Sequence, residues 1–132
     1  MSDLRVHKTK YINETKRVSF KYDGKNYFGY EGDTLASALL ANGVHLIGRS
    51  FKYHRPRGIM SCGSEEPNAI CQISDKNDLT EPNVRATELE IYDGLEAFSQ
   101  NCWPNVKFDI GGINNLISPL IPAGFYYKTF MW

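Results

Sequence analysis

The chain has 132 residues, which is enough for one domain with an ordinary hydrophobic core. Its fifteen basic and fifteen acidic residues cancel, so the whole molecule has no field that would attract nucleic acid or an anionic membrane. The spacing of its three cysteines matches no zinc ribbon, and no apolar run is long enough for a signal peptide or a membrane span, so we expect reduced thiols in a cytoplasmic protein.

The first predicted element is a β-hairpin. Residues 1–16 carry scattered polar side chains with little periodicity, which predicts a flexible N-terminal arm. Apolar residues then alternate over 18–22, a turn signal follows at Asp23 and Gly24, and aromatic residues continue over 27–30. A run of this kind on both sides of Asp-Gly is typical of two antiparallel strands joined by a tight turn.

A short amphipathic helix is predicted next, over residues 35–41. Asp33 or Thr34 can accept hydrogen bonds from its first turn, and Asn42 with Gly43 is a typical left-handed stop signal. The helix should therefore be short and bounded at both ends.

Further strands are predicted over residues 69–73 and 87–91, with a polar, turn-like stretch over 74–83 between them. Hairpin, helix, loop and strands in this order predict an α+β fold of the β-grasp, ferredoxin-like type over residues 17–93, in which one helix packs across a mixed sheet.

Residues 94–132 are predicted to form an extended C-terminal arm that leads to a further domain or a subunit interface. Two prolines interrupt residues 116–122, which therefore cannot be one continuous helix. Five of the last eight residues are aromatic, which would leave a sticky patch at a free terminus. The tail either folds back on the domain or lies against a neighbouring domain or subunit.

A basic, glycine-punctuated loop follows the helix and is the most distinctive stretch of the chain. Up to residue 57 it contains no acidic residue, and its basic residues are His45, Arg49, Lys52, His54, Arg55 and Arg57. Arginine offers planar, paired donors that suit phosphate oxygens. The alternatives are a solvated or acid-paired surface loop, or a nucleic-acid patch in which Phe51 and Tyr53 stack on bases.

The same loop runs into a cysteine that invites comparison with iron-sulfur sites. Plant-type [2Fe-2S] ferredoxins use C-x4-C-x2-C followed by a more distant cysteine. Counting from Cys62, the next two ligand positions fall on Pro67 and Ile70, and Cys71 is one residue out of register. We therefore expect no metal site and read Cys62 as a vestigial cluster position.

Two adjacent carboxylates, Glu65 and Glu66, lie where the second cysteine of a cluster loop would approach. Neighbouring carboxylates on a loop can do acid-base work when their surroundings drive their pKa values apart. They are more often exposed or paired with arginine, so we expect plain exposure or a partnership with Arg55 or Arg57. No catalytic residue is predicted.

Several long strings in order resemble the N-terminal region of the alpha subunits of heterotetrameric sarcosine oxidases. The strings are residues 32–43, 48–63, 65–69, 92–97 and 123–132. The resemblance covers about residues 15–132. It implies a β-grasp domain of the 2Fe-2S ferredoxin-like family whose cluster ligands are lost, within an enzyme that oxidatively demethylates sarcosine to glycine with one-carbon transfer and hydrogen peroxide formation.

The resemblance also implies cofactors and partners. The parent complex would contain FAD, FMN, NAD and tetrahydrofolate, with none of them bound by this chain. Its partners would be the remainder of the alpha subunit and the flavin-bearing beta subunit, and the chain would be a structural, non-catalytic interface domain. Residues that would face a flavin phosphate or a subunit interface are Arg49, Lys52, His54, Arg55 and Arg57.

Two other functions stay open. One is a [2Fe-2S] electron-transfer domain of a related amine dehydrogenase, against which the residues at Pro67 and Ile70 count. The other is a freestanding β-grasp module that binds a protein partner.

Overall fold

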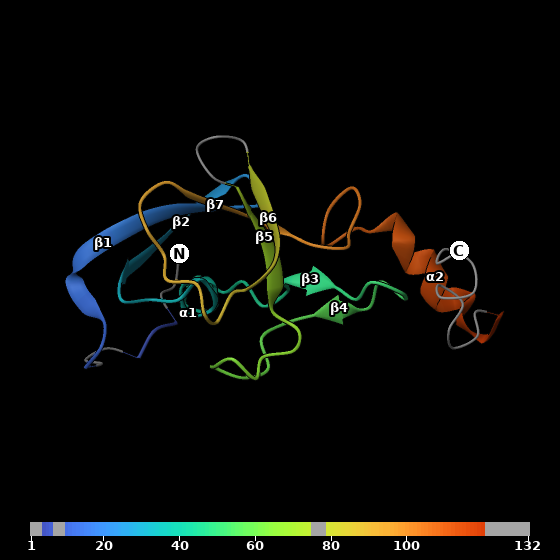
Figure 1. Ribbon diagram of the computed structural model, residues 1–132, viewed down its shortest axis with the longest axis horizontal. Helices are drawn as coiled ribbons and strands as arrows, with labels where there is room; N and C mark the ends of the chain where they lie inside the picture. Colours follow the sequence, from blue (N-terminus) through green and yellow to red (C-terminus); the bar gives the residue numbers. More distant parts are fainter. Residues whose placement is uncertain (1–3, 7–9, 75–78, 121–132) are drawn as a thin grey trace.

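The computed structural model describes residues 4–6, 10–74 and 79–120 (Figure 1). The elements in chain order are β1 (Asn13–Tyr22), β2 (Lys25–Glu31), α1 (Leu35–Ala41), β3 (Gly48–Arg49), β4 (Pro56–Arg57), β5 (Ile70–Ser74), β6 (Thr80–Arg85), β7 (Leu95–Ser99), the 3-10 turn η1 (Ile110–Gly112), α2 (Ile113–Leu116) and the 3-10 turn η2 (Ser118–Leu120). Within these residues, no helix has the length and apolar content that crossing a membrane requires. The aromatic tail lies outside the described residues.

The main sheet has five strands in the order β2-β1-β7-β5-β6. β1 and β7 run parallel in its middle, and the other neighbouring pairs are antiparallel. α1 packs on one face, while the small β3–β4 hairpin projects toward α2 (Figure 1). A mixed sheet with one packed helix confirms the predicted α+β, β-grasp fold.

The β1–β2 hairpin follows from its turn residues and its alternation. Tyr22 pairs with Lys25, and the two residues between them, Asp23 at φ 48° and Gly24 at φ 75°, both take the left-handed conformation that a type I′ turn requires. Along β1, Val18, Phe20 and Tyr22 point into the core. The predicted hairpin is confirmed.

The N-terminal arm is shorter than predicted and part of it is anchored. β1 begins at Asn13, so residues 13–16 belong to the sheet. Closer to the N-terminus, the backbone N–H of Leu4 donates to Ala41 O, and Arg5 Nη1 lies 2.7 Å from Asp33 Oδ1 with both side chains almost fully buried. These contacts hold residues 4 and 5 against the domain.

Helix α1 begins and ends where the sequence predicts. The Thr34 hydroxyl accepts the Ser37 N–H at 3.2 Å, and Gly43, at φ 75°, follows the last turn. The helix lies close to β2 because Gly29 has no side chain: a Cβ there would lie 2.5 Å from Ile91 Cδ1 and 3.1 Å from Ala38 Cβ.

The strand predicted over residues 87–91 is wrong. The backbone of this segment is instead hydrogen-bonded to the N-terminus of α1: Leu35 N donates to Leu89 O, and Ile91 N donates to Asp33 O. Its alternating apolar residues point into the core, and among the described residues its only strand-like pairing is an isolated bridge from Glu90 to Thr34. The preceding segment, predicted as turn-like over 74–83, contains most of β6, an exposed edge strand that tolerates Pro82.

The predicted domain boundary at residue 93 leaves β7, a central strand of the sheet, outside the domain. β7 lies between β1 and β5, and its Leu95 and Ala97 are buried. Five residues with only two inward-facing side chains give a weak strand signal, so the sequence alone predicts an arm here. Beyond it, α2 and η2 are separate short helices, as expected from the proline at Pro119.

A pair of leucine substitutions tests this placement of β7. Leu95 is 0% exposed and Leu120 is 81% exposed. We expect Leu95→Ala to lower the free energy of unfolding by about 3 kcal/mol, because it leaves a cavity in the core. Leu120→Ala should change it by less than about 0.5 kcal/mol. Urea unfolding measures both changes. Equally small changes in the free energy of unfolding would mean that the residues from 94 onward form an arm outside the domain.

Candidate functional site

The basic loop contains β3, β4 and the turn between them, and its first arginine, Arg49, faces inward. Arg49 Nε donates to Val106 O at 2.8 Å, Nη1 to His54 O at 2.8 Å and Nη2 to Lys107 O at 3.3 Å. All three guanidinium nitrogens of Arg49 are therefore engaged with the chain's own carbonyl groups. Arg49 holds the basic loop against residues 106 and 107.

Asp109 completes this attachment. Its Oδ2 lies 2.8 Å from His54 Nδ1 and 3.7 Å from Arg49 Nε, and its Oδ1 accepts the backbone N–H of Trp103. Burial alone would raise the pKa of Asp109, but the hydrogen bonds from Trp103 and His54 outweigh it and hold the pKa below its ordinary value. The carboxylate thus joins the basic loop to the segment that begins η1.

Gly111 makes the approach of His54 possible. A Cβ at Gly111 would lie 2.3 Å from His54 Nδ1, so any side chain there would displace the imidazole. His54 and Arg49 both contact Asp109. These two of the five predicted site residues are therefore paired with an acidic residue, which was one of the alternatives for the basic loop. Asp109 itself was missed, although an Asp ahead of a short helical turn is a familiar capping pattern.

The other three predicted residues lie toward the outside of the hairpin. Lys52 Nζ and Arg55 Cζ each lie 4.9 Å from the centre of the Tyr53 ring, and Arg55 Nε also donates to Asn115 Oδ1 at 3.2 Å. Arg57 lies in β4, where its backbone carbonyl accepts the Ile47 N–H. A role of these residues toward a flavin phosphate or a subunit stays a prediction.

Glu66 is the most unusual charged residue of the chain, with only 1% of its surface exposed. Its Oε2 accepts the N–H groups of Met60 and Ser61, and its Oε1 accepts those of Asn68, at 2.8 Å, and Ala69, at 3.1 Å. The expectation of an exposed carboxylate or a pair with Arg55 or Arg57 is therefore wrong for Glu66. Its main partners are backbone N–H groups, for which a single sequence gives no signal.

The electrostatics of Glu66 follow from these donors. Burial alone would raise the pKa of Glu66, but the four backbone N–H groups stabilise the anion more strongly and lower the pKa from 4.5 to about 2. Glu65, its neighbour, is exposed, and its carboxylate accepts other N–H groups of the loop, those of Glu65 itself, Gly63 and Cys62, which hold its pKa below the ordinary value. Of the two adjacent carboxylates, Glu66 is the one buried among the N–H groups of Met60, Ser61, Asn68 and Ala69.

The cysteines do not form a metal site in the described part of the chain. Cys62 is exposed, whereas Cys71 is fully buried and its thiol lies 3.4 Å from Val84 O. Burial raises the pKa of Cys71 to about 12, which disfavours the thiolate that iron requires. No group of three or more His, Cys, Asp or Glu in this part of the chain is arranged to hold a metal.

A [2Fe-2S] cluster therefore does not fit the residues of this loop. Pro67 and Ile70 occupy the second and third ligand positions and carry no donor atom for iron in their side chains. The N–H groups that would surround an anionic cluster are instead bonded to Glu66. We derive no electron-transfer step through this loop.

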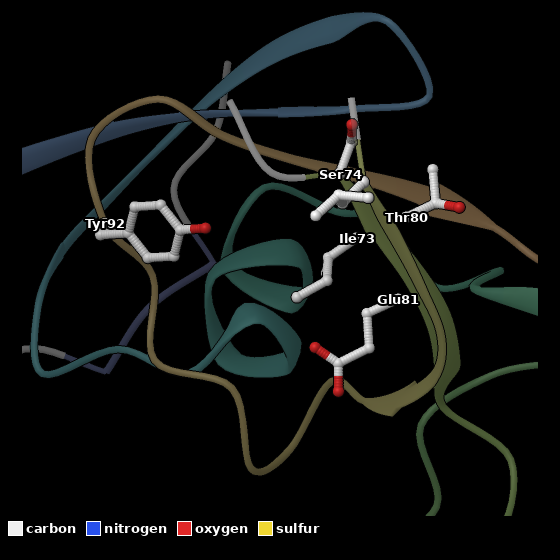
Figure 2. A pocket seen from close by; sticks show the side chains of 6 residues that line it. Ile73, Ser74, Thr80, Glu81 and Tyr92 are labelled. Carbon is white, nitrogen blue, oxygen red and sulfur yellow. The ribbon is translucent and has the colours of Figure 1, made fainter. Parts of the chain in front are cut away.

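Two of the surface hollows lie away from the loop between β4 and β5. Figure 2 shows the smaller, of about 340 Å³, where Tyr92 stands across from Ile73, Ser74, Thr80 and Glu81 on β5 and β6. The described residues of its rim are largely exposed and include no buried charge. The larger, of about 610 Å³, lies between the β1–β2 turn, the loop after α1 and residues 105–107. Neither brings together the predicted site residues.

A β-grasp sheet with a loop of converging N–H groups ahead of β5 defines a ferredoxin-like domain. The chain belongs to the family of 2Fe-2S iron-sulfur cluster binding domains, whose profile matches residues 15–102. The fold and the sequence pattern support this membership. Of the first three cluster-ligand positions in the loop, only the one at Cys62 holds a cysteine.

Sarcosine oxidase alpha subunits are among the similar proteins, which confirms the predicted resemblance. The chain is 57% identical over all 132 residues to sarcosine oxidase subunit alpha of Rhizobium meliloti (strain 1021), of which it spans 13%. It is 41% identical over 88 residues to sarcosine oxidase subunit alpha of Corynebacterium sp. (strain U-96), which is 65% of this chain and 9% of that relative.

A solved structure shares the fold. The crystal structure of L-proline dehydrogenase from P. horikoshii matches with a TM-score of 0.53 and 24% identity, over 68% of this chain and 16% of that chain. This likeness concerns the fold alone. In every one of these matches, the chain spans only a small part of the protein to which it is similar.

Acid stability tests the buried anion. Because the pKa of Glu66 is lowered on folding, its contribution to stability is complete above about pH 4.5 and is lost as the pH falls toward about 2. The loss should reach about 3 kcal/mol for this group. Urea unfolding at a series of pH values should show a shallower acid slope for Glu66→Gln than for the unchanged chain. Identical slopes would contradict an ionised Glu66.

Limited proteolysis tests the attachment made by Asp109. Asp109→Ala removes the acceptor of His54 and Trp103, so the β3–β4 loop should open and trypsin should cleave after Lys52 several-fold faster. Glu81→Ala, which removes an exposed carboxylate on β6, is the matched control and should leave the rate unchanged. Equal cleavage rates in all three proteins would show that Asp109 does not hold this loop.

Proposed function

We propose that this chain is the N-terminal domain of a sarcosine oxidase alpha subunit and acts as a structural interface domain of that enzyme. The observation that carries the proposal is the 57% identity over all 132 residues to one such subunit. The parent enzyme would oxidatively demethylate sarcosine to glycine, with one-carbon transfer and hydrogen peroxide formation, in the cytoplasm. This domain would contribute no catalytic residue of its own.

An exposed apolar surface supports a role in assembly. We define it by the exposed side chains that follow β7: Trp103, Phe108, Ile110, Ile113, Leu116, Ile117 and Leu120. Monomeric proteins rarely expose so many large apolar groups within one segment, and such surfaces mark interaction sites. Figure 1 shows α2 and its neighbouring turns at the end of the molecule away from β1 and β2.

The occupant of this apolar surface would be the remainder of the alpha subunit. The relative that matches the whole chain is far longer than the chain, which spans 13% of it, so a large body of protein is available to cover the surface. The basic loop lies next to it and would face the flavin-bearing beta subunit through Lys52, Arg55 and Arg57. FAD, FMN, NAD and tetrahydrofolate would be bound elsewhere in the complex.

Purification of the chain within its native assembly tests this function. We expect it to co-purify with flavin-containing polypeptide, and the assembly should form hydrogen peroxide when given sarcosine. Leu116→Asp with Leu120→Asp should reduce the assembled fraction by at least about tenfold, because two charges would be buried at the interface. Leu79→Asp changes another strongly exposed leucine, beside β6, and should have no effect.

Two results would contradict the proposal. The first is an assembly that retains flavin and sarcosine-dependent peroxide formation with both leucines replaced, which would remove the apolar surface from the interface. The second is a chain that co-purifies with no flavoprotein, which would favour a freestanding β-grasp binding module.

A further inference from the structure

The loop between β4 and β5 surrounds one carboxylate with N–H groups from its first part and from its last part. Met60 and Ser61 lie before Cys62, while Asn68 and Ala69 lie just ahead of β5 (Figure 1, the green segment between β4 and β5). Backbone N–H groups of all four residues point to the carboxylate of Glu66, two to each oxygen. The Ser61 hydroxyl adds a fifth donor to Oε2 at 3.2 Å.

Other residues hold the loop in place by hydrogen bonds to its carbonyl groups. These contacts do not use the N–H groups that face the Glu66 carboxylate. Thr87 Oγ1 donates to Gly63 O at 2.8 Å, and Arg85 Nε donates to Glu66 O at 3.2 Å. The N–H of Glu66 itself donates to Gly63 O. These contacts use loop carbonyl groups, while the N–H groups of Met60, Ser61, Asn68 and Ala69 converge on the Glu66 carboxylate.

Converging backbone N–H groups form a concave anion site, which proteins use to hold phosphates and iron-sulfur clusters. The family to which the chain belongs is defined by cluster binding, and the cluster ligand positions here are Pro67 and Ile70. We propose that the Glu66 carboxylate is a built-in anion that takes the place of the cluster, and that the loop remains a site for a small carboxylate ion when this side chain is shortened.

The charge and the burial together favour this reading over a simple turn. A turn-forming carboxylate usually accepts one or two nearby N–H groups and keeps contact with water. Glu66 is 1% exposed and bridges residues six positions before it and three positions after it. Buried N–H groups without an acceptor are costly, so the four donors require an anion or several neutral acceptors at this place.

Three substitutions in the full chain separate the possibilities. Glu66→Ala removes the anion and leaves space for another. Glu66→Gln keeps the volume but supplies one acceptor oxygen, and its NH₂ group faces two donors. Glu81→Ala removes an exposed carboxylate on β6, outside this loop, and is the matched control.

Amide hydrogen exchange, followed by NMR, gives a local measurement. In Glu66→Ala the amides of Met60, Ser61, Asn68 and Ala69 should exchange at least about tenfold faster, while the β1–β2 amides should change less. Sodium formate should restore protection in this variant, and sodium chloride at the same ionic strength should not. Formate should have no effect on Glu66→Gln, because the amide fills the site, and Glu81→Ala should behave as the unchanged chain.

The design stays informative if Glu66→Ala unfolds. Formate binds only the folded loop and should then promote refolding by mass action, which far-ultraviolet circular dichroism can follow. No effect of formate on exchange or refolding would overturn the inference. Uptake of ferrous iron and sulfide by the unchanged chain, with the visible absorption of a [2Fe-2S] cluster, would also overturn it. These outcomes do not depend on whether the chain assembles with a sarcosine oxidase.

Discussion

One buried carboxylate, Glu66, accepts backbone N–H groups from both arms of a loop, and neighbouring elements depend on where that loop lies. Ala69 donates to Glu66 and accepts the N–H of Ala86, whose carbonyl in turn accepts the N–H of Ala36 in the first turn of α1. A continuous path of hydrogen bonds thus joins the loop, the turn after β6 and the helix. An anion inside the loop is consequently part of how the helix is seated on the sheet.

Buried carboxylates organise two other places in the domain, each with a different kind of partner. At the start of α1, Asp33 accepts hydrogen bonds from the Arg5 guanidinium, the Tyr30 N–H and the Ser37 hydroxyl. Asp109 faces His54 and Arg49 and holds the basic loop against η1. Burying a charge is unfavourable unless it is paired or hydrogen-bonded, so each site fixes the segments that supply its donors.

Sequence patterns predicted the parts of the fold that depend on local chemistry. Asp23 and Gly24 set the hairpin turn, Thr34 caps the helix, and the alternation in β1 marks its buried face. The errors arose where distant contacts decide the outcome. The segment around Leu89 looks like a strand but pairs with the helix N-terminus, and β7 is too short to show its central place.

The candidate site was predictable in its position but not in its chemistry. The glycines, the basic residues and Cys62 marked the loops around residues 45–69 as unusual. The sequence could not reveal that Arg49 and His54 face Asp109, since 55 residues separate His54 from that partner. Nor could it distinguish Glu66 from Glu65, because the difference lies in the direction of backbone N–H groups that every residue type shares.

Titration of the Glu66 carboxyl carbon by NMR tests the central claim most directly. The account predicts a chemical shift that stays constant through the ordinary range of glutamate and changes only as the pH approaches about 2. A midpoint near 4.5, like that of an exposed glutamate, would mean that the loop does not hold an anion and would contradict the account.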